Sequence, residues 1–119
     1  MALLSIYKTD VFAHQKSFVH IFKPLRNNVG IFTEQGGTIG WLNSSSGFAV
    51  IDSQFPTSAP HVIEDLKKLG DKPFKYLINT HHHGDHTAGN IAFRGIAEKL
   101  LLIKIRWLIR KGLPKKQIT

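Results

Sequence analysis

Two short apolar runs on either side of an amphipathic segment constrain the fold of this chain most strongly. Residues 48–51 and 74–79 are typical of buried strands, because they are continuous in apolar side chains and end at polar residues. The segment between them has apolar residues at helical spacing, namely Val62, Ile63, Leu66 and Leu69. A strand, a helix and a strand joined by short links predict two parallel strands in one sheet, with the helix packed on its face.

The ends of this helix are also marked in the sequence. Thr57 or Ser58 can cap its N-terminus, and Pro60 suits the first turn. Gly70 is a typical residue just beyond a helix C-terminus. The sequence therefore predicts a helix that begins near residue 58 and ends shortly before Gly70.

The region before the βαβ unit is predicted to be rich in strands. Residues 18–22, 30–33 and 38–42 mix apolar and β-branched side chains. Gly36-Gly37 and residues 44–47 are typical turn sequences between them. We expect strands that follow one another by hairpins and lead into residues 48–51, which we expect to be buried on both faces of the sheet.

The second apolar run leads directly into a loop rich in histidine. The carboxyl ends of parallel strands are where ligands gather, and Asp52 and Thr80 mark these two ends. After Thr80 the chain reads His81-His82-His83-Gly84-Asp85-His86, so four of the seven histidines fall within six residues. Imidazole and carboxylate together form a donor set for first-row transition metals, with zinc as the default ion over iron or manganese.

The spacing within this loop predicts two pairs of metal ligands. In an extended segment His81 and His83 point to the same side and can share one ion. Gly84 permits a bend, after which Asp85 and His86 emerge at a distance that suits a second ion. His82 falls between the ligand positions, and we expect it to face solvent or to support a ligand.

Other residues that could belong to a site have simpler interpretations. His14, His20 and His61 have no partner nearby in the sequence, and we expect ordinary surface or helix-capping histidines. Trp41 and Phe48 could flank a substrate, although packing in the core is the favoured interpretation. The absence of cysteine excludes a disulfide scaffold, a cysteine zinc finger and a thiol nucleophile.

The pattern His81-x-His83-x-Asp85-His86 resembles the metallo-β-lactamase superfamily, because it follows a strand and an earlier strand that ends at Asp52. The hairpin around Gly36-Gly37, the run Val50-Ile51-Asp52-Ser53 and residues 76–80 extend the resemblance over residues 18–99. The resemblance implies an α+β or α/β fold, the N-terminal half of an αββα sandwich, and metal-dependent hydrolysis.

The resemblance also implies a role for each site residue. His81 and His83 would bind a first zinc ion, and Asp85 and His86 a second, with Asp85 as the candidate catalytic residue. Asp52 and Thr80 would support these ligands without contacting the ions, while a helix-capping or turn role is the alternative for Asp52. Water or hydroxide activated by zinc would attack an ester, thioester, amide or lactam, or phosphodiester.

The family completes its sites with two further histidines and a bridging aspartate, which have no match in this sequence. No histidine follows His86, and Glu98 is the one acidic residue after Asp85. Each zinc would have two protein ligands where a catalytic site normally has three. A full sandwich also needs roughly twice these 119 residues. We therefore expect a partial domain over residues 1–99 with weak or no activity, and whether this chain is an enzyme stays open.

The positive charge of the chain is concentrated in its last part. The net charge is +8; residues 1–90 carry eight Lys/Arg and seven Asp/Glu, whereas residues 91–119 carry eight Lys/Arg and Glu98. Residues 100–119 mix apolar and basic side chains without a clear amphipathic pattern. Suppose that Glu98-Lys99 is encoded by a run of adenines from which one has been lost. For one choice of codons, restoring that adenine shifts the reading frame, and the tail is then translated as a strand end followed by a helix of mixed charge. We therefore hypothesise that residues 100–119 are read out of frame.

Two function classes follow from these features. The first is the zinc hydrolase, with a small-molecule substrate, no nucleic-acid partner, and an exposed apolar sheet face that could self-associate. The alternative is a non-enzymatic metal-binding module whose basic tail contacts a membrane or nucleic acid. No apolar stretch of membrane-spanning length and no signal peptide is visible, so a cytoplasmic location is the default expectation.

Overall fold

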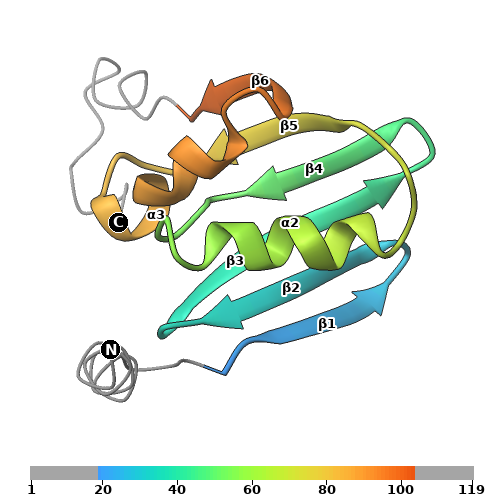
Figure 1. Ribbon diagram of the computed structural model, residues 1–119, viewed down its shortest axis with the longest axis horizontal. Helices are drawn as coiled ribbons and strands as arrows, with labels where there is room; N and C mark the ends of the chain where they lie inside the picture. The colour runs from blue at the N-terminus through green and yellow to red at the C-terminus, as the bar shows by residue number, and fades with distance from the viewer. Residues whose placement is uncertain (1–18, 104–119) are drawn as a thin grey trace, which may run out of the picture.

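A six-stranded mixed sheet with its helices on one face forms the body of the protein, in a computed structural model that describes residues 19–103 (Figure 1). The strands are β1 (Ile21–Arg26), β2 (Val29–Glu34), β3 (Gly37–Ser44), β4 (Gly47–Ile51), β5 (Phe74–Asn79) and β6 (Ala97–Leu102). Helix α2 (Ala59–Lys67) connects β4 to β5; the short helix α3 (Gly84–Thr87) and the 3₁₀ helix η1 (Ala88–Phe93) connect β5 to β6.

The strands lie side by side in the order in which they occur along the chain. Strands β1 to β4 form an antiparallel meander, and β5 and β6 then pair in parallel with β4 and β5. The predicted βαβ unit is thus confirmed as β4-α2-β5. Because parallel strands end at the same edge of a sheet, the segments that follow β4 and β5 meet there (Figure 1).

The hydrophobic core lies between the sheet and the helices. Buried residues alternate along β2, in the middle of β3 and in β4, as the alternation of side chains in a strand requires. Trp41 and Phe48 belong to this core, as favoured from the sequence, and Trp41 stacks on Phe22 with ring centroids 4.6 Å apart. The core residues are Phe32, Ile39, Trp41, Phe48, Val50, Ala59, Val62, Ile63, Leu66, Phe74, Leu77 and Phe93.

The opposite face of the sheet is open within the described residues. The prediction that residues 48–51 are buried on both faces is wrong, because Ile51 is 42% exposed and Ala49 is only partly buried. No described element packs on that face, so the apolar side chains that alternate with the core positions contact solvent. The exposed ones include Val29, Leu42, Ile51, Tyr76 and Leu101.

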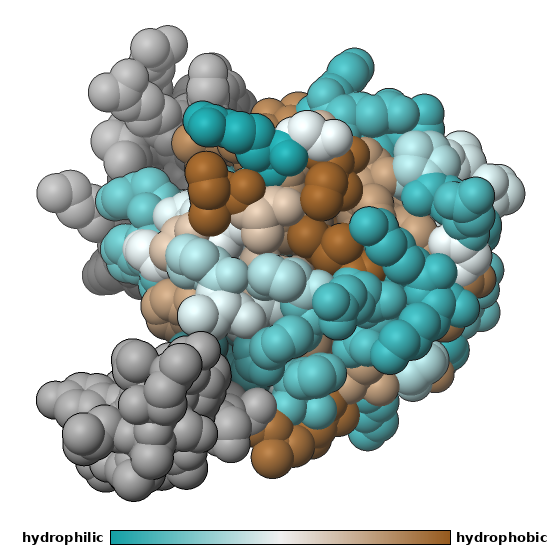
Figure 2. Space-filling view, viewed as in Figure 1, coloured by the Kyte–Doolittle hydropathy of each residue, from teal (hydrophilic) through white to brown (hydrophobic). Residues whose placement is uncertain are grey.

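The helix-bearing face is more polar over α2 than over the segment that leads into β6. Figure 2 shows hydrophilic residues across α2 and a group of apolar residues above it. Ile91 of η1 and Leu100 of β6 line a shallow hollow there and are more than half exposed. Among the described residues, the helices are too short to cross a membrane.

Several predicted boundaries change in the structure. Helix α2 ends at Lys67, so Leu69 lies outside it and is 41% exposed rather than on the apolar face. Lys68 is the C-cap residue, which places Gly70 beyond the position predicted for it. The hairpin between β1 and β2 turns at Asn27-Asn28, whose positive φ angles of 52° and 65° match a tight hairpin turn.

The predicted division at residue 99 falls inside a strand. Strand β6 continues across it to Leu102, and Leu101 pairs with Ile78 of β5. Residues 104–119 lie outside the described residues, as does His14. The partial domain over residues 1–99 and the out-of-frame hypothesis for residues 100–119 therefore stay predictions.

Candidate metal centre

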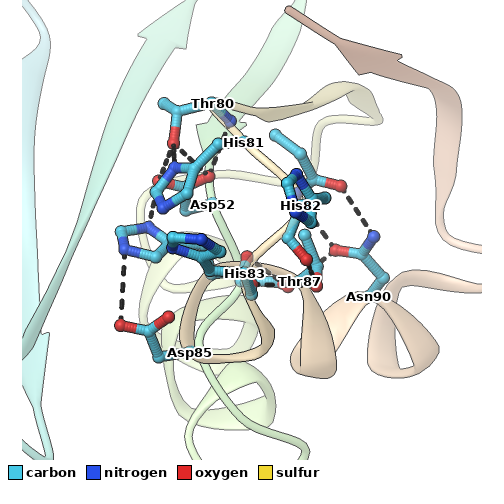
Figure 3. Close-up of polar contacts among 11 residues, drawn as sticks. Asp52, Thr80, His81, His82, His83, Asp85, Thr87 and Asn90 are labelled. Atoms are coloured by element: carbon cyan, nitrogen blue, oxygen red, sulfur yellow. Dashed lines mark hydrogen bonds and ion pairs between the residues drawn. The ribbon is translucent and has the colours of Figure 1, made fainter. Parts of the chain in front are cut away.

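Asp52 is the polar centre around which the histidine loop is arranged. It follows β4 directly, is 5% exposed, and has a φ angle of +68°. This left-handed conformation is uncommon outside glycine but is better tolerated by aspartate than by most residues. The Asp52 backbone N–H donates to the Ile78 carbonyl at 2.8 Å, which ties the end of β4 to β5. The carboxylate is thereby held beside the start of the loop (Figure 3).

The Asp52 carboxylate accepts hydrogen bonds from two residues of the loop. The Thr80 backbone N–H donates to Oδ1 at 2.9 Å, and the Thr80 hydroxyl donates to Oδ2 at 2.9 Å. His86 Nδ1 lies 2.8 Å from Oδ2. These contacts join Asp52 and Thr80 to the histidine loop, and their support of metal ligands stays a prediction.

These hydrogen bonds also fix the tautomers of two histidines. A carboxylate can only accept, so the proton of His86 lies on Nδ1. The Thr80 hydroxyl donates its single proton to Asp52, so His81 Nδ1, 2.8 Å from Thr80 Oγ1, must be the donor in that pair. In their neutral form both rings then carry the lone pair on Nε2, which is the form in which imidazole binds a metal ion.

The other loop residues are linked to this carboxylate through His86. The centroid of the His81 ring lies 4.0 Å from that of His86 and 4.6 Å from that of His83. Asp85 Oδ2 lies 3.5 Å from His86 Nε2. His82 is exposed, as is His83, and its ring meets that of His83 edge-on at 5.1 Å. The structure thus brings the six predicted site residues into one neighbourhood at the carboxyl ends of β4 and β5 (Figure 3).

A second set of hydrogen bonds, which the sequence analysis did not predict, joins the histidine loop and η1 to the segment after β4 and to the end of β5. The Ser53 N–H donates to the His86 carbonyl at 2.9 Å, and its hydroxyl donates to Asn90 Oδ1 at 2.7 Å. Asn79 and Asn90 exchange two amide hydrogen bonds of 3.1 and 2.7 Å. A polar residue in the last position of a buried strand, as Asn79 is, was the available signal for this bracing.

Glycine is required in this loop at Gly89 rather than at Gly84. A Cβ atom on Gly89 would lie 2.1 Å from the Ser53 carbonyl oxygen, where η1 crosses the segment after β4. Gly84 is not among the residues with a positive φ angle, and a Cβ atom there would meet nothing within 4 Å. The bend predicted at Gly84 therefore does not depend on glycine.

A second histidine cluster lies outside this loop. His20 and His61, expected to be ordinary surface or helix-capping histidines, both contact the buried carboxylate of Glu34. Among residues 19–103, these three form the group whose metal-binding atoms all lie within 4.8 Å of one another. The three residues come from separate segments, so local spacing in the sequence carries no signal for the cluster.

Comparison with known proteins agrees with this geometry. The family model described as the metallo-beta-lactamase superfamily matches residues 32–103, which include the end of β2, all of β3 to β6 and the whole histidine loop. This chain belongs to the metallo-β-lactamase superfamily.

Solved metallo-β-lactamases share the fold of the chain. The mono-zinc form of FIM-1 from Pseudomonas aeruginosa is 18% identical, with a TM-score of 0.64 over 83% of this chain and 49% of that chain. MEM-A1, a subclass B3 enzyme from a soil metagenome library, is 23% identical, with a TM-score of 0.61 over 80% and 38%. BJP-1 of Bradyrhizobium japonicum is 28% identical, with a TM-score of 0.53 over 62% and 29%.

The extent of these matches defines what is shared. The chain spans less than half the length of each of these three metallo-β-lactamases. The family match over residues 32–103 includes α2 and the histidine loop, and the fold corresponds to the expected N-terminal half of the αββα sandwich. The family match and the structural matches together show that this chain has a metal-dependent hydrolase-like fold.

Proposed function

We propose that the His81–His86 loop binds zinc and that the chain carries the metal-binding part of a zinc-dependent hydrolase site. His81 and His83 are the ligands of one ion, and Asp85 and His86 are the ligands of a second. The proposal rests on the hydrogen bonds through Asp52, because they leave Nε2 of both His81 and His86 free to bind a metal.

The contact between Asp85 and His86 supports the second ion. With the proton on Nδ1, His86 presents the lone pair of Nε2 to the Asp85 carboxylate 3.5 Å away. Two groups with lone pairs do not attract each other unless a proton or a cation lies between them. A tetrahedral zinc site with bonds of about 2.0–2.1 Å has ligand atoms about 3.3–3.4 Å apart, close to this separation.

The residues of this chain have separate tasks in the proposed site. Bound zinc lowers the pKa of its water towards neutrality and polarises a substrate oxygen. Asp85 is at the open surface of the loop, where it can orient a reacting water and hold a proton from it. Asp52 and Thr80 fix the two imidazole rings, and Ser53 with Asn90 holds the loop against the sheet. The substrate class is an ester, thioester, amide or lactam, or phosphodiester.

The residues present predict weak turnover at best for the 119-residue chain alone. They provide two protein ligands to each ion, whereas catalytic zinc sites usually have three. The alternative, a non-enzymatic metal-binding module with a basic tail, remains a prediction, because that tail lies outside the described residues.

The test combines zinc binding with hydrolysis by the full chain. Bound zinc is measured by equilibrium dialysis for the parent, for a variant with His81→Ala, His83→Ala and His86→Ala, and for His82→Ala as the matched control. We expect the triple variant to lose one or two equivalents of zinc and His82→Ala to lose none. Equal zinc content in the parent and the triple variant would refute the loop as a metal site.

Hydrolysis is then assayed on a lactam, a lactone, a thioester and a phosphodiester. Any turnover should disappear with a chelator and in His83→Ala, and turnover that survives both would refute a metal-dependent reaction. Fast, chelator-sensitive turnover would support the hydrolase and overturn the expectation of weak activity. Salt-sensitive binding to anionic vesicles without turnover would favour the alternative module.

A further inference from the structure

We propose that His20, Glu34 and His61 form a second metal site, which binds a divalent transition-metal ion of the zinc class. The site lies between the end of β2 and the first turn of α2, and it shares no residue with the histidine loop. The inference therefore does not depend on the proposed hydrolase function.

The donor atoms of this cluster are already arranged around one point. His61 Nδ1 donates a hydrogen bond to Glu34 Oε1 at 2.8 Å, and His20 Nδ1 lies 3.5 Å from the same oxygen. An ion would replace the proton of His61 Nδ1 and widen that pair to the roughly 3.3 Å between ligand atoms in a tetrahedral zinc site. Two imidazoles and one carboxylate are a known donor set for zinc, and the fourth position would be left to water.

The Glu34 carboxylate has a buried oxygen without a partner. Its side chain is 3% exposed, and Oε2 makes no hydrogen bond to any group within residues 19–103, although Oε1 is shared by the two histidines. Burying a carboxylate without compensation is costly, and the cost is recovered only by pairing or by metal coordination. An ion held by Glu34 would compensate the charge that this buried oxygen carries.

Protons on the two histidines are a poor substitute for such an ion. The His20 and His61 rings stack with centroids 4.8 Å apart and planes 14° apart. If both rings were protonated, two like charges would face each other across this stack. A metal ion instead uses the lone pairs of two neutral rings and brings its two positive charges next to the carboxylate.

Asp65 completes the arrangement behind His20. Its Oδ2 is buried and lies 3.5 Å from His20 Nε2, a distance within ion-pair range but without hydrogen-bond geometry, while Lys68 Nζ contacts its Oδ1 at 3.4 Å. If His20 binds the ion through Nδ1, the proton on its Nε2 lies next to this carboxylate, with 3.5 Å between nitrogen and oxygen. A carboxylate behind a metal-bound histidine is the usual way in which the ring is oriented.

The cluster is both anchored and accessible. His20 also stacks on the fully buried Phe32, with ring centroids 5.4 Å apart, and His61 belongs to α2. The side chains of His20 and His61 are 37% and 41% exposed, so an ion can enter from solvent. Ligands held by a sheet and a helix lose little further freedom on binding.

The test uses the full chain in which His81, His83 and His86 are replaced by alanine, so that the loop no longer contributes. Zinc is titrated into this background, and into the same background with Glu34→Gln or with His61→Gln. We expect one equivalent of zinc in the background, and a loss of affinity above about 100-fold in both added variants, since even outer partners of metal ligands contribute roughly 10- to 100-fold. Glu64→Gln, an exposed neighbour on α2, is the matched control and should bind as the background does.

A second measurement covers the case in which the background variant does not fold. Cobalt(II) is added to the parent chain, and the ring signals of His20 and His61 are followed by NMR, with His61→Gln used for assignment. Large paramagnetic shifts of both rings are expected at the third equivalent or earlier, since the loop is proposed to hold two ions. Absence of zinc from a folded background, equal affinity in Glu34→Gln, or unshifted His20 and His61 signals would each overturn the proposal, whatever the loop binds.

Discussion

Replacing Asp52 by asparagine tests how the candidate metal loop is organised. Asparagine keeps the size of the side chain and tolerates the left-handed backbone that Asp52 adopts at φ +68°. Its amide oxygen can still accept the hydrogen bond that the Thr80 backbone N–H donates to Asp52 Oδ1 at 2.9 Å in the parent. Its NH₂ group replaces Oδ2, however, and cannot accept the proton that His86 Nδ1 donates.

The expected effect follows from the tautomer of His86. If Nδ1 must accept rather than donate, the proton moves to Nε2 and blocks the atom that faces Asp85. Loss of such a supporting hydrogen bond lowers metal affinity by roughly 10- to 100-fold, or about 1.4–2.7 kcal/mol. The free energy of unfolding without metal should fall by about 1–3 kcal/mol, because a buried hydrogen bond to a charged group is lost.

Three measurements check this reasoning. Zinc affinity is measured by competition with a chromophoric chelator, stability by urea denaturation, and the His86 tautomer by long-range nitrogen–proton NMR correlation. Asp71→Asn, an exposed aspartate between α2 and β5, is the control and should change none of them. If Asp52→Asn binds zinc within twofold of the parent and His86 keeps its proton on Nδ1, the role assigned to the Asp52 carboxylate is wrong.

Other positions give independent predictions. Gly89→Ala should lower stability in urea by about 1–3 kcal/mol, because its Cβ would meet the Ser53 carbonyl at 2.1 Å, whereas Gly84→Ala should be nearly neutral; equal effects would contradict the packing described. Phe48→Ala should cost about 3–5 kcal/mol in the same assay, since the ring is fully buried, and a loss below 1 kcal/mol would argue against that core. Leu42→Lys, on the open face of the sheet, should lower the average mass that light scattering measures as the protein concentration rises, because it reduces self-association. A mass equal to that of the parent would show that this face does not cause self-association.

The order of the strands, the helix and the loop could be predicted because each depends on short-range patterns. Alternation, helical spacing and the position of Asp52 and Thr80 at strand ends are visible within a few residues of each other. The four residues proposed as metal ligands also fall within six positions of the sequence, so their proximity needs no knowledge of the fold. These features account for the agreement between the predicted and observed βαβ unit.

The features that sequence reasoning missed depend on contacts between distant segments. Glu34 meets His61 only because β2 and the first turn of α2 lie at the same end of the molecule, and His20 reaches both from the segment before β1. The exposure of Ile51 depends on what covers the second face of the sheet, which the alternation within β4 does not reveal. Leu69 fits the helical pattern, but the helix ends before it.

The hydrogen bonds between the loop and the end of β4 make metal binding and strand pairing parts of one equilibrium. Ser53 N–H and Gly89 N–H cross between the two segments, and the Asp52 N–H closes on Ile78 of β5. An ion that binds the ordered loop therefore stabilises these backbone bonds as well, by about 2.7 kcal/mol at a concentration 100 times its dissociation constant. Hydrogen exchange at the Asp52 and Ser53 amides would then slow as zinc is added, so that amides just beyond β4, without any contact to the metal, report its occupancy.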